Sequence, residues 1–184
     1  MNFNNLPRDL PIPKDDGTAN HLEGSFVPDI ELPNQDGNYL KLSRKDSFRL
    51  VLFCYPMTGI PNKPSPEKWD LIPGARGCTP QNCSFRDNYD DLIINNSIPV
   101  GLTTQSVDEI KEMTLRLKIP YDVLSDANFK FIKALKIPTF KVDKTIFVKR
   151  ITFIIQNSYI EKVFYPIFPP DRNVKDVINW LKEN

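Results

Sequence analysis

One apolar run determines how this chain folds: Arg49-Leu50-Val51-Leu52-Phe53-Cys54-Tyr55, which Pro56 ends. Its six consecutive apolar residues are typical of a strand that is buried on both faces of a sheet, because a strand with one face in water would alternate apolar and polar side chains. The run therefore predicts a strand at the centre of a covered sheet.

Downstream of this run, helical and extended patterns alternate. We expect helices over residues 80–95, 106–118, 129–135 and 171–181, and strands over residues 97–103, 149–156 and 159–165. The last two strands are joined by the turn Asn157-Ser158 and should run antiparallel. This order predicts an α/β fold with a central mixed sheet flanked by helices.

Upstream of the run, residues 26–42 alternate around Asp36-Gly37, which predicts an N-terminal hairpin. Residues 1–24 are polar and proline-rich, and we expect an arm that lies on the surface or on a neighbouring subunit. Residues 25–184 should form a single domain. Its loop at about 57–72 is longer than usual and has the character of an insertion.

Composition narrows the possible partners. The 184 residues carry 24 basic and 23 acidic side chains, a net charge of +1, which argues against nucleic acid or a membrane surface as the main partner. No apolar stretch approaches the roughly 18 residues of a membrane span, and the N-terminus lacks the pattern of a secretory signal. We therefore expect a cytoplasmic protein.

The main candidates for reactive residues are two cysteines that are close in sequence, Cys78 and Cys83. Cys78 stands at the start of a predicted helix, where free amide groups and the helix dipole favour a negative charge, and Arg76 and Arg86 are close in sequence. In one intact helix the two Cα atoms would lie roughly 8.5 Å apart, farther than the roughly 7 Å that a disulfide spans. The spacing therefore predicts a two-step cycle: a peroxide oxidises Cys78 to a sulfenic acid, and the helix then unwinds so that Cys83 can form a disulfide.

Other interpretations of the cysteines remain open at this point. The pair could be two small core residues, whereas a structural zinc site would need four ligands from three cysteines and the arm residue His21. A thiol–disulfide reductase would use Cys-x-x-Cys spacing. Cys54 lies within the buried run and should be an inert apolar side chain. Arg150 opens a predicted strand and would stabilise the thiolate and the peroxide oxygens if it lay near Cys78; otherwise it is a solvated strand-end arginine.

The cysteine segment is the most specific motif: Gly77-Cys78-Thr79-Pro80-Gln81-Asn82-Cys83-Ser84-Phe85-Arg86-Asp87. It is accompanied by Phe26-Val27-Pro28-Asp29, Val51-Leu52-Phe53-Cys54-Tyr55-Pro56, Leu124-Ser125-Asp126 and Arg150-Ile151-Thr152-Phe153-Ile154-Ile155. Over about residues 24–184 the sequence resembles the peroxiredoxins of the AhpC/TSA redoxin superfamily, most closely the Q-type (bacterioferritin-comigratory-protein-like) group.

This resemblance implies a thioredoxin-like fold without a metal or an organic cofactor. It implies that Cys78 is the peroxidatic cysteine, Cys83 the resolving cysteine and Arg150 the peroxide-binding arginine. The substrates would be hydrogen peroxide and small alkyl hydroperoxides, the reductant a thioredoxin or a glutaredoxin-like protein, and the assembly a monomer or a homodimer.

The sequence departs from the family pattern in one place. Leu71 and Ala75 stand where the family usually has a proline and a threonine or serine, and an insertion of about 16 residues separates Pro56 from the cysteine segment. The hydroxyl that orients the peroxide in the family is therefore unassigned here, and Thr58 or Thr79 could supply it. An alternative function is a redox-sensing binding module, in which the Cys78–Cys83 disulfide acts as a switch and peroxidase activity is weak.

Overall fold

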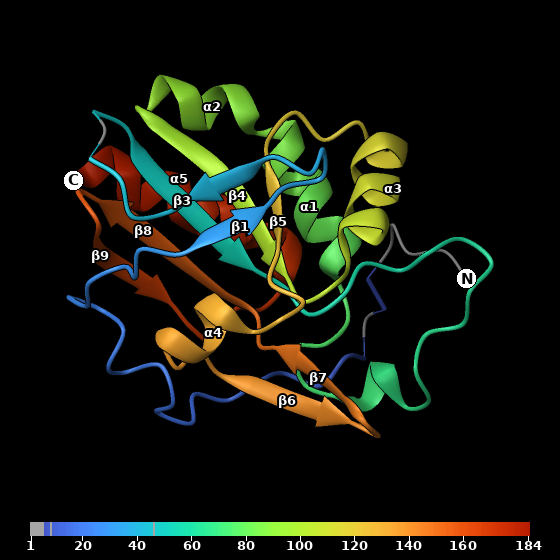
Figure 1. The fold of residues 1–184 in the computed structure, drawn as a ribbon. Coiled ribbons are helices and arrows are strands. Elements are labelled where there is room, and N and C mark those ends of the chain that lie inside the picture. Colours follow the sequence, from blue (N-terminus) through green and yellow to red (C-terminus); the bar gives the residue numbers. More distant parts are fainter. Residues whose placement is uncertain (1–5, 8, 46) are drawn as a thin grey trace.

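The fold is built on a five-stranded mixed sheet with the strand order β5-β4-β3-β8-β9 (Figure 1). The computed structural model describes residues 6–7, 9–45 and 47–184. The strands are β3 (Arg49–Cys54), β4 (Ser97–Thr103), β5 (Val123–Ser125), β8 (Ile151–Gln156) and β9 (Tyr159–Phe164). β3, β4 and β5 run parallel, and β8 is antiparallel to both β3 and β9. The apolar run is thus the central strand of a mixed sheet, as predicted.

The helices divide between the two faces of this sheet. They are α1 (Cys78–Asp87), α2 (Tyr89–Ile94), α3 (Val107–Leu117), α4 (Lys130–Ala134) and α5 (Asn173–Glu183). Val51, Phe53 and Tyr55 of the apolar run pack against α1, α2, α3 and α5, whereas the alternate residues Leu50 and Leu52 pack with α4 and the N-terminal hairpin. Both faces of β3 are therefore covered, which explains why its sequence does not alternate.

The predicted helix over residues 80–95 is in fact two helices, α1 and α2, separated at Asn88. The Asn88 side-chain amide donates a hydrogen bond to the carbonyl of Ser84 at 2.8 Å. Asparagine competes in this way with the regular helical hydrogen bonds, and the backbone at Asn88 leaves the helical region with φ −114°. The apolar spacing was therefore correct, but the break was not predicted from it.

Two hairpins lie outside the main sheet. The predicted N-terminal hairpin is present as β1 (Glu31–Pro33) and β2 (Tyr39–Lys41). The second, β6 (Thr139–Val142) and β7 (Thr145–Val148), was not predicted. It packs against the 3₁₀ turn η1 (Trp69–Leu71) of the long loop, with the rings of Trp69 and Phe147 5.0 Å apart. This contact fixes the loop that precedes the cysteine segment.

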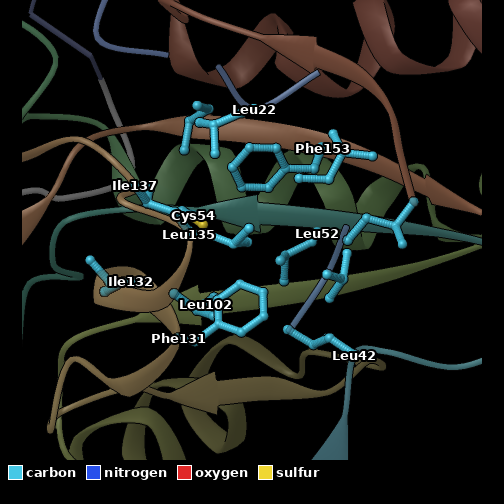
Figure 2. Packing of buried hydrophobic residues seen from close by; sticks show 14 of the residues in the cluster. Leu22, Leu42, Leu52, Cys54, Leu102, Phe131, Ile132, Leu135, Ile137 and Phe153 are labelled. Carbon is cyan, nitrogen blue, oxygen red and sulfur yellow. The ribbon is translucent and has the colours of Figure 1, made fainter. Parts of the chain in front are cut away.

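The described part of the N-terminal arm packs on its own domain. Leu22 is fully buried in the same cluster as Leu52 and Phe153 (Figure 2). The Gly24 amide donates to the carbonyl of Ile160 at 2.8 Å, which joins the end of the arm to β9. Residues 1–5 and 8 of the arm lie outside the described residues, and the division into an arm (1–24) and a domain (25–184) stays a prediction.

Candidate active site

Cys78 is the first residue of α1 and is buried, with 2% of its surface exposed. The chain enters the helix through Gly77, which has a left-handed backbone with φ 103°. A Cβ atom at this position would lie 2.7 Å from Pro170 and 2.8 Å from Leu6. Only glycine therefore allows this close entry, which places the sulfur at the N-terminal end of the helix dipole.

The Cys78 sulfur lies among groups that favour a negative charge. The Arg150 guanidinium donates to Sγ from Nη2 at 3.2 Å, and the backbone amide of Met57 donates at 3.4 Å. When protonated, the thiol can donate to the carbonyl of Ala75 at 3.5 Å. A buried cation, an amide and a helix N-terminus together stabilise a thiolate, which is the nucleophilic form of cysteine.

Arg150 is buried and held in a fixed orientation. Its Nη2 atom also donates to the carbonyls of Ala75 at 3.3 Å and Arg76 at 3.2 Å, and its Nη1 atom donates to the side-chain oxygen of Gln81. Gln81 in turn donates to Asn173 at 3.0 Å. Arg150 is therefore part of a connected network and is not a solvated strand-end residue.

Gln81 and Asn173 were not identified from the sequence as site residues. Gln81 lies three residues after Cys78 on the same helix, and residues at that spacing share one helix face. The three-residue spacing from Cys78 could therefore have identified Gln81 as a site residue from the sequence. Asn173 accepts hydrogen bonds from both Gln81 and, at 2.8 Å, Thr152, but it comes from the start of α5 and only the tertiary fold brings it to the site.

The two threonines proposed to supply the missing hydroxyl have different surroundings. The Thr79 Oγ1 atom is buried without a hydrogen-bond partner among the described residues, and Thr79 lines a small pocket together with Cys78 and Arg76. The Thr58 hydroxyl donates to Gln105 at 3.0 Å. The geometry therefore favours Thr79 as the hydroxyl that could meet a bound peroxide.

Cys83 lies half-buried on the same helix as Cys78, and both thiols are free. Burial raises the pKa of the Cys83 thiol. The five-residue separation within α1 puts the two Cα atoms roughly 8.5 Å apart, so a disulfide requires the helix to change. Arg86, which the sequence suggested as a second cation for Cys78, instead donates to Asp87 at 2.8 Å and to the Leu117 carbonyl at 2.7 Å, on the Cys83 side of the helix.

Three side-chain hydrogen bonds stabilise α1 between and beside the two cysteines. Asn82 donates to the Cys78 carbonyl at 3.0 Å, and the Tyr121 hydroxyl donates to the Asn82 carbonyl at 2.8 Å. Ser84 donates to the Asp171 carbonyl at 2.6 Å. Any unwinding of the helix must break some of these contacts.

The remaining candidate groups lie apart from the site. Cys54 is fully buried in β3, where burial raises the pKa of its thiol. His21 makes a 3.0 Å hydrogen bond between its Nε2 atom and the Leu135 carbonyl. Within the described ranges, no group of three or more histidine, cysteine or acidic side chains could hold a metal ion, and no helix is long and apolar enough to cross a membrane.

Comparisons with known proteins agree with this geometry. The sequence matches the AhpC/TSA family over residues 71–162, half of the chain. It is 24% identical to chloroplastic peroxiredoxin Q of Sedum lineare over 172 residues, 94% of this chain and 84% of the relative. It is 26% identical to peroxiredoxin Bcp of Escherichia coli over 165 residues, 88% of this chain and 96% of the relative.

Solved structures show the same arrangement of elements. The crystal structure of peroxidoxin BcpB from Mycobacterium tuberculosis superposes with a TM-score of 0.73 at 26% identity, covering 89% of this chain and 98% of that chain. The Xylella fastidiosa PrxQ structure, at 19% identity and a TM-score of 0.72, supports the thioredoxin-like fold. The chain therefore belongs to the AhpC/TSA family and is a peroxidase oxidoreductase of the peroxiredoxin kind.

Proposed function

We propose that Cys78 is the peroxidatic cysteine of a two-cysteine peroxidase and that Cys83 resolves it. The observation that supports this most strongly is the 3.2 Å contact between the Cys78 sulfur and the Arg150 guanidinium at the start of α1. In the first step the thiolate attacks one peroxide oxygen, the O–O bond breaks, and the second oxygen leaves as an alcohol or water after taking a proton. Cys78 is then a sulfenic acid.

In the second step the Cys83 sulfur attacks the Cys78 sulfur, and the sulfenic oxygen leaves as water. The product is an intramolecular disulfide, which a dithiol reductant must reduce to restore both thiols. Cys83 is half-buried whereas Cys78 is buried, so an incoming thiolate reaches the Cys83 sulfur more easily. This favours a thioredoxin or a glutaredoxin-like protein that attacks at Cys83.

Arg150 and Thr79 complete the proposed peroxide site. Arg150 binds the peroxide oxygens as charge develops on them, and the otherwise unpaired Thr79 hydroxyl orients the peroxide. Hydrogen peroxide and small alkyl hydroperoxides are the proposed substrates. The cytoplasmic location and a monomer or homodimer remain part of this proposal.

The test is mass spectrometry of the protein after one equivalent of hydrogen peroxide, with disulfides mapped. We expect a Cys78–Cys83 disulfide in the wild type. Cys78→Ser should abolish peroxide consumption, and Cys83→Ser should allow one rapid oxidation but no turnover with thioredoxin and its reductase. Oxidation of Cys54 in place of Cys78 would contradict the proposal, and a slow first oxidation would favour the redox-sensing alternative.

A further inference from the structure

The pocket at Cys78 is very small. It has a volume of about 10 Å³, and a cavity needs roughly 10–15 Å³ to hold one water molecule. Its lining residues are Met57, Gly59, Ser65, Trp69, Arg76, Gly77, Cys78 and Thr79. The pocket is thus at the limit for a single water molecule, so even hydrogen peroxide needs a small shift of the lining residues, and a bulkier hydroperoxide needs a larger one.

Residues of the insertion form one wall of this pocket. Gly59, Ser65 and Trp69 all come from the segment between Met57 and Ile72. Trp69 is the best anchored of the three, because it is only 4% exposed and its ring packs edge-on against Phe147 at 5.0 Å. The insertion that interrupts the family pattern thus supplies three of the residues that line the pocket at Cys78.

The wall is tied to the domain on both sides of Ser65. Before Ser65, the Thr58 amide donates to Gln105 at 2.8 Å, and Arg116 donates to the Gly59 carbonyl at 3.0 Å. After Ser65, Asp70 pairs with Arg76 at 3.4 Å. Anchors at both ends keep the insertion over Cys78.

A larger groove lies on the other side of this wall. Its volume is about 290 Å³, and it shares Met57, Gly59 and Ser65 with the Cys78 pocket. The groove could accommodate the apolar body of an organic hydroperoxide. Those shared residues separate such a molecule from the sulfur unless the wall moves.

We propose that the insertion is a size filter that restricts Cys78 to hydrogen peroxide and the smallest alkyl hydroperoxides, and that Trp69 is its specificity-determining residue. This inference rests on the proposed peroxidatic role of Cys78. It goes further by assigning the insertion a role in substrate selection.

The test compares the second-order rate constants for the first oxidation of Cys78 by hydrogen peroxide and by cumene hydroperoxide. They are measured by quenched alkylation and mass spectrometry in the full chain, for the wild type and for Trp69→Phe, Trp69→Leu and Trp69→Ala. We expect the ratio of the cumene hydroperoxide rate constant to the hydrogen peroxide rate constant to rise as the side chain shrinks, by about tenfold or more in Trp69→Ala. Leu71→Ala is the matched control, because Leu71 lies in the same turn but is 70% exposed.

The graded series keeps the test informative if Trp69→Ala unfolds, since Trp69→Phe and Trp69→Leu retain apolar packing against Phe147. An unchanged ratio of the two rate constants across the folded variants would overturn the size filter. Equal rate constants of the wild type for both peroxides would also overturn the size filter, but they would leave the proposed peroxidase function in place. A wild type that reacts with neither peroxide at Cys78 would instead refute the proposed function.

Discussion

At the scale of single residues, Arg150 shows how the fold makes an exposed type of side chain part of a buried site. Its Nη2 atom reaches the Cys78 sulfur and the carbonyls of Ala75 and Arg76, and its Nη1 atom donates to the side chain of Gln81. A planar fork of donors suits this arrangement, and a lysine ammonium would satisfy fewer of these acceptors. We therefore expect the rate of Cys78 oxidation to depend on the orientation of the Arg150 guanidinium as much as on its charge.

Arg150→Lys should slow the first oxidation of Cys78 by about a hundredfold, because a donor that stabilises developing charge is displaced. Stopped-flow consumption of hydrogen peroxide measures this rate. The control is Arg49→Lys, which alters another strand-start arginine that pairs with Glu161 at 2.8 Å, away from the site. Equal rates in the wild type and Arg150→Lys would show that charge alone suffices.

The two candidate threonines should respond differently to loss of the hydroxyl. Thr79→Val should slow oxidation about tenfold, without lowering stability, since it loses a hydrogen bond to the peroxide oxygens on which charge develops. Thr58→Val breaks the bond to Gln105 and should lower the free energy of unfolding by about 1 kcal/mol with little effect on rate. Rate constants and urea denaturation distinguish the two, and a rate defect confined to Thr58→Val would reverse the assignment.

At the scale of elements, the proposed cycle requires α1 to be rigid for the first step and to unwind for the second. Its N-terminus holds the Cys78 sulfur against Arg150, and the ring of Phe85 stacks on Phe53 of β3 at 4.0 Å. Burial raises the pKa of Tyr121, so its hydroxyl stays protonated and donates to the Asn82 carbonyl between the two cysteines. Tyr121 is thus one of the contacts that must break before the disulfide forms.

Tyr121→Phe should accelerate disulfide formation after oxidation about fivefold, because roughly 1 kcal/mol of hydrogen bonding to the folded helix is removed. The first oxidation should be unaffected. Tyr89→Phe removes a hydroxyl from the neighbouring stacked tyrosine and is the matched control. This role would be contradicted if Tyr121→Phe formed the disulfide more slowly than the wild type. It would also be contradicted if Tyr121→Phe were less stable but formed the disulfide no faster.

Disulfide formation should also depend on pH. Burial raises the pKa of Cys83 above its usual 9.0, so below that value its thiol is mostly protonated, and the reactive thiolate becomes more abundant as pH rises. The rate of resolution, followed by quenched mass spectrometry, should therefore increase from pH 6 to pH 8.5. A flat profile over this range would mean that unwinding alone limits the step.

Local sequence patterns predicted the elements better than their boundaries. The apolar run correctly predicted β3, and the helix expected over residues 106–118 is present as α3, which Ser106 caps through a capping box with Glu109. The break at Asn88 depends on one side-chain hydrogen bond, and the β6–β7 hairpin depends on packing against Trp69. Such contacts are not encoded in periodicity.

At the scale of the whole molecule, the candidate active site draws on segments that are far apart in sequence. Arg150 and Cys78 are 72 positions apart. The antiparallel pairing of β3 with β8 sets Ile151 opposite Cys54, so Arg150 lies at the end of β3 from which the chain continues toward Cys78. Motif resemblance suggested this pair, but the supporting role of Asn173 emerges only from the folded topology. Residues that act through another residue lack a local motif of their own.

The N-terminal arm is attached to this assembly partly by charge. Asp16 lies 2.5 Å from Lys149 and accepts a hydrogen bond from Tyr165 at 2.8 Å, and these contacts, led by Lys149, hold the pKa of Asp16 well below its usual 3.8. A carboxyl with a depressed folded-state pKa contributes its full stability at pH values above its unfolded-state pKa, and that contribution is lost progressively as pH falls from there through the folded-state pKa.

Asp16→Asn should therefore lower the free energy of unfolding at pH 7 by roughly 0.5 kcal/mol, a small amount because the pair is partly exposed and screened. The difference between variant and wild type should begin to shrink as pH falls below about 3.8 and should be lost only near the much lower folded-state pKa of Asp16. Denaturant titrations at several pH values measure it, with Asp15→Asn as the neighbouring control. A difference that persists at low pH would assign the effect to packing.

Trp69 also gives the molecule a natural optical probe. The chain has two tryptophans, and Trp180 lies beside Arg49 whereas Trp69 borders the same pocket as the Cys78 sulfur. Indole emission is sensitive to nearby charge and polarity, so conversion of a thiolate to a sulfenic acid should change it. In a Trp180→Phe background, each redox step should give its own fluorescence phase, without any added dye.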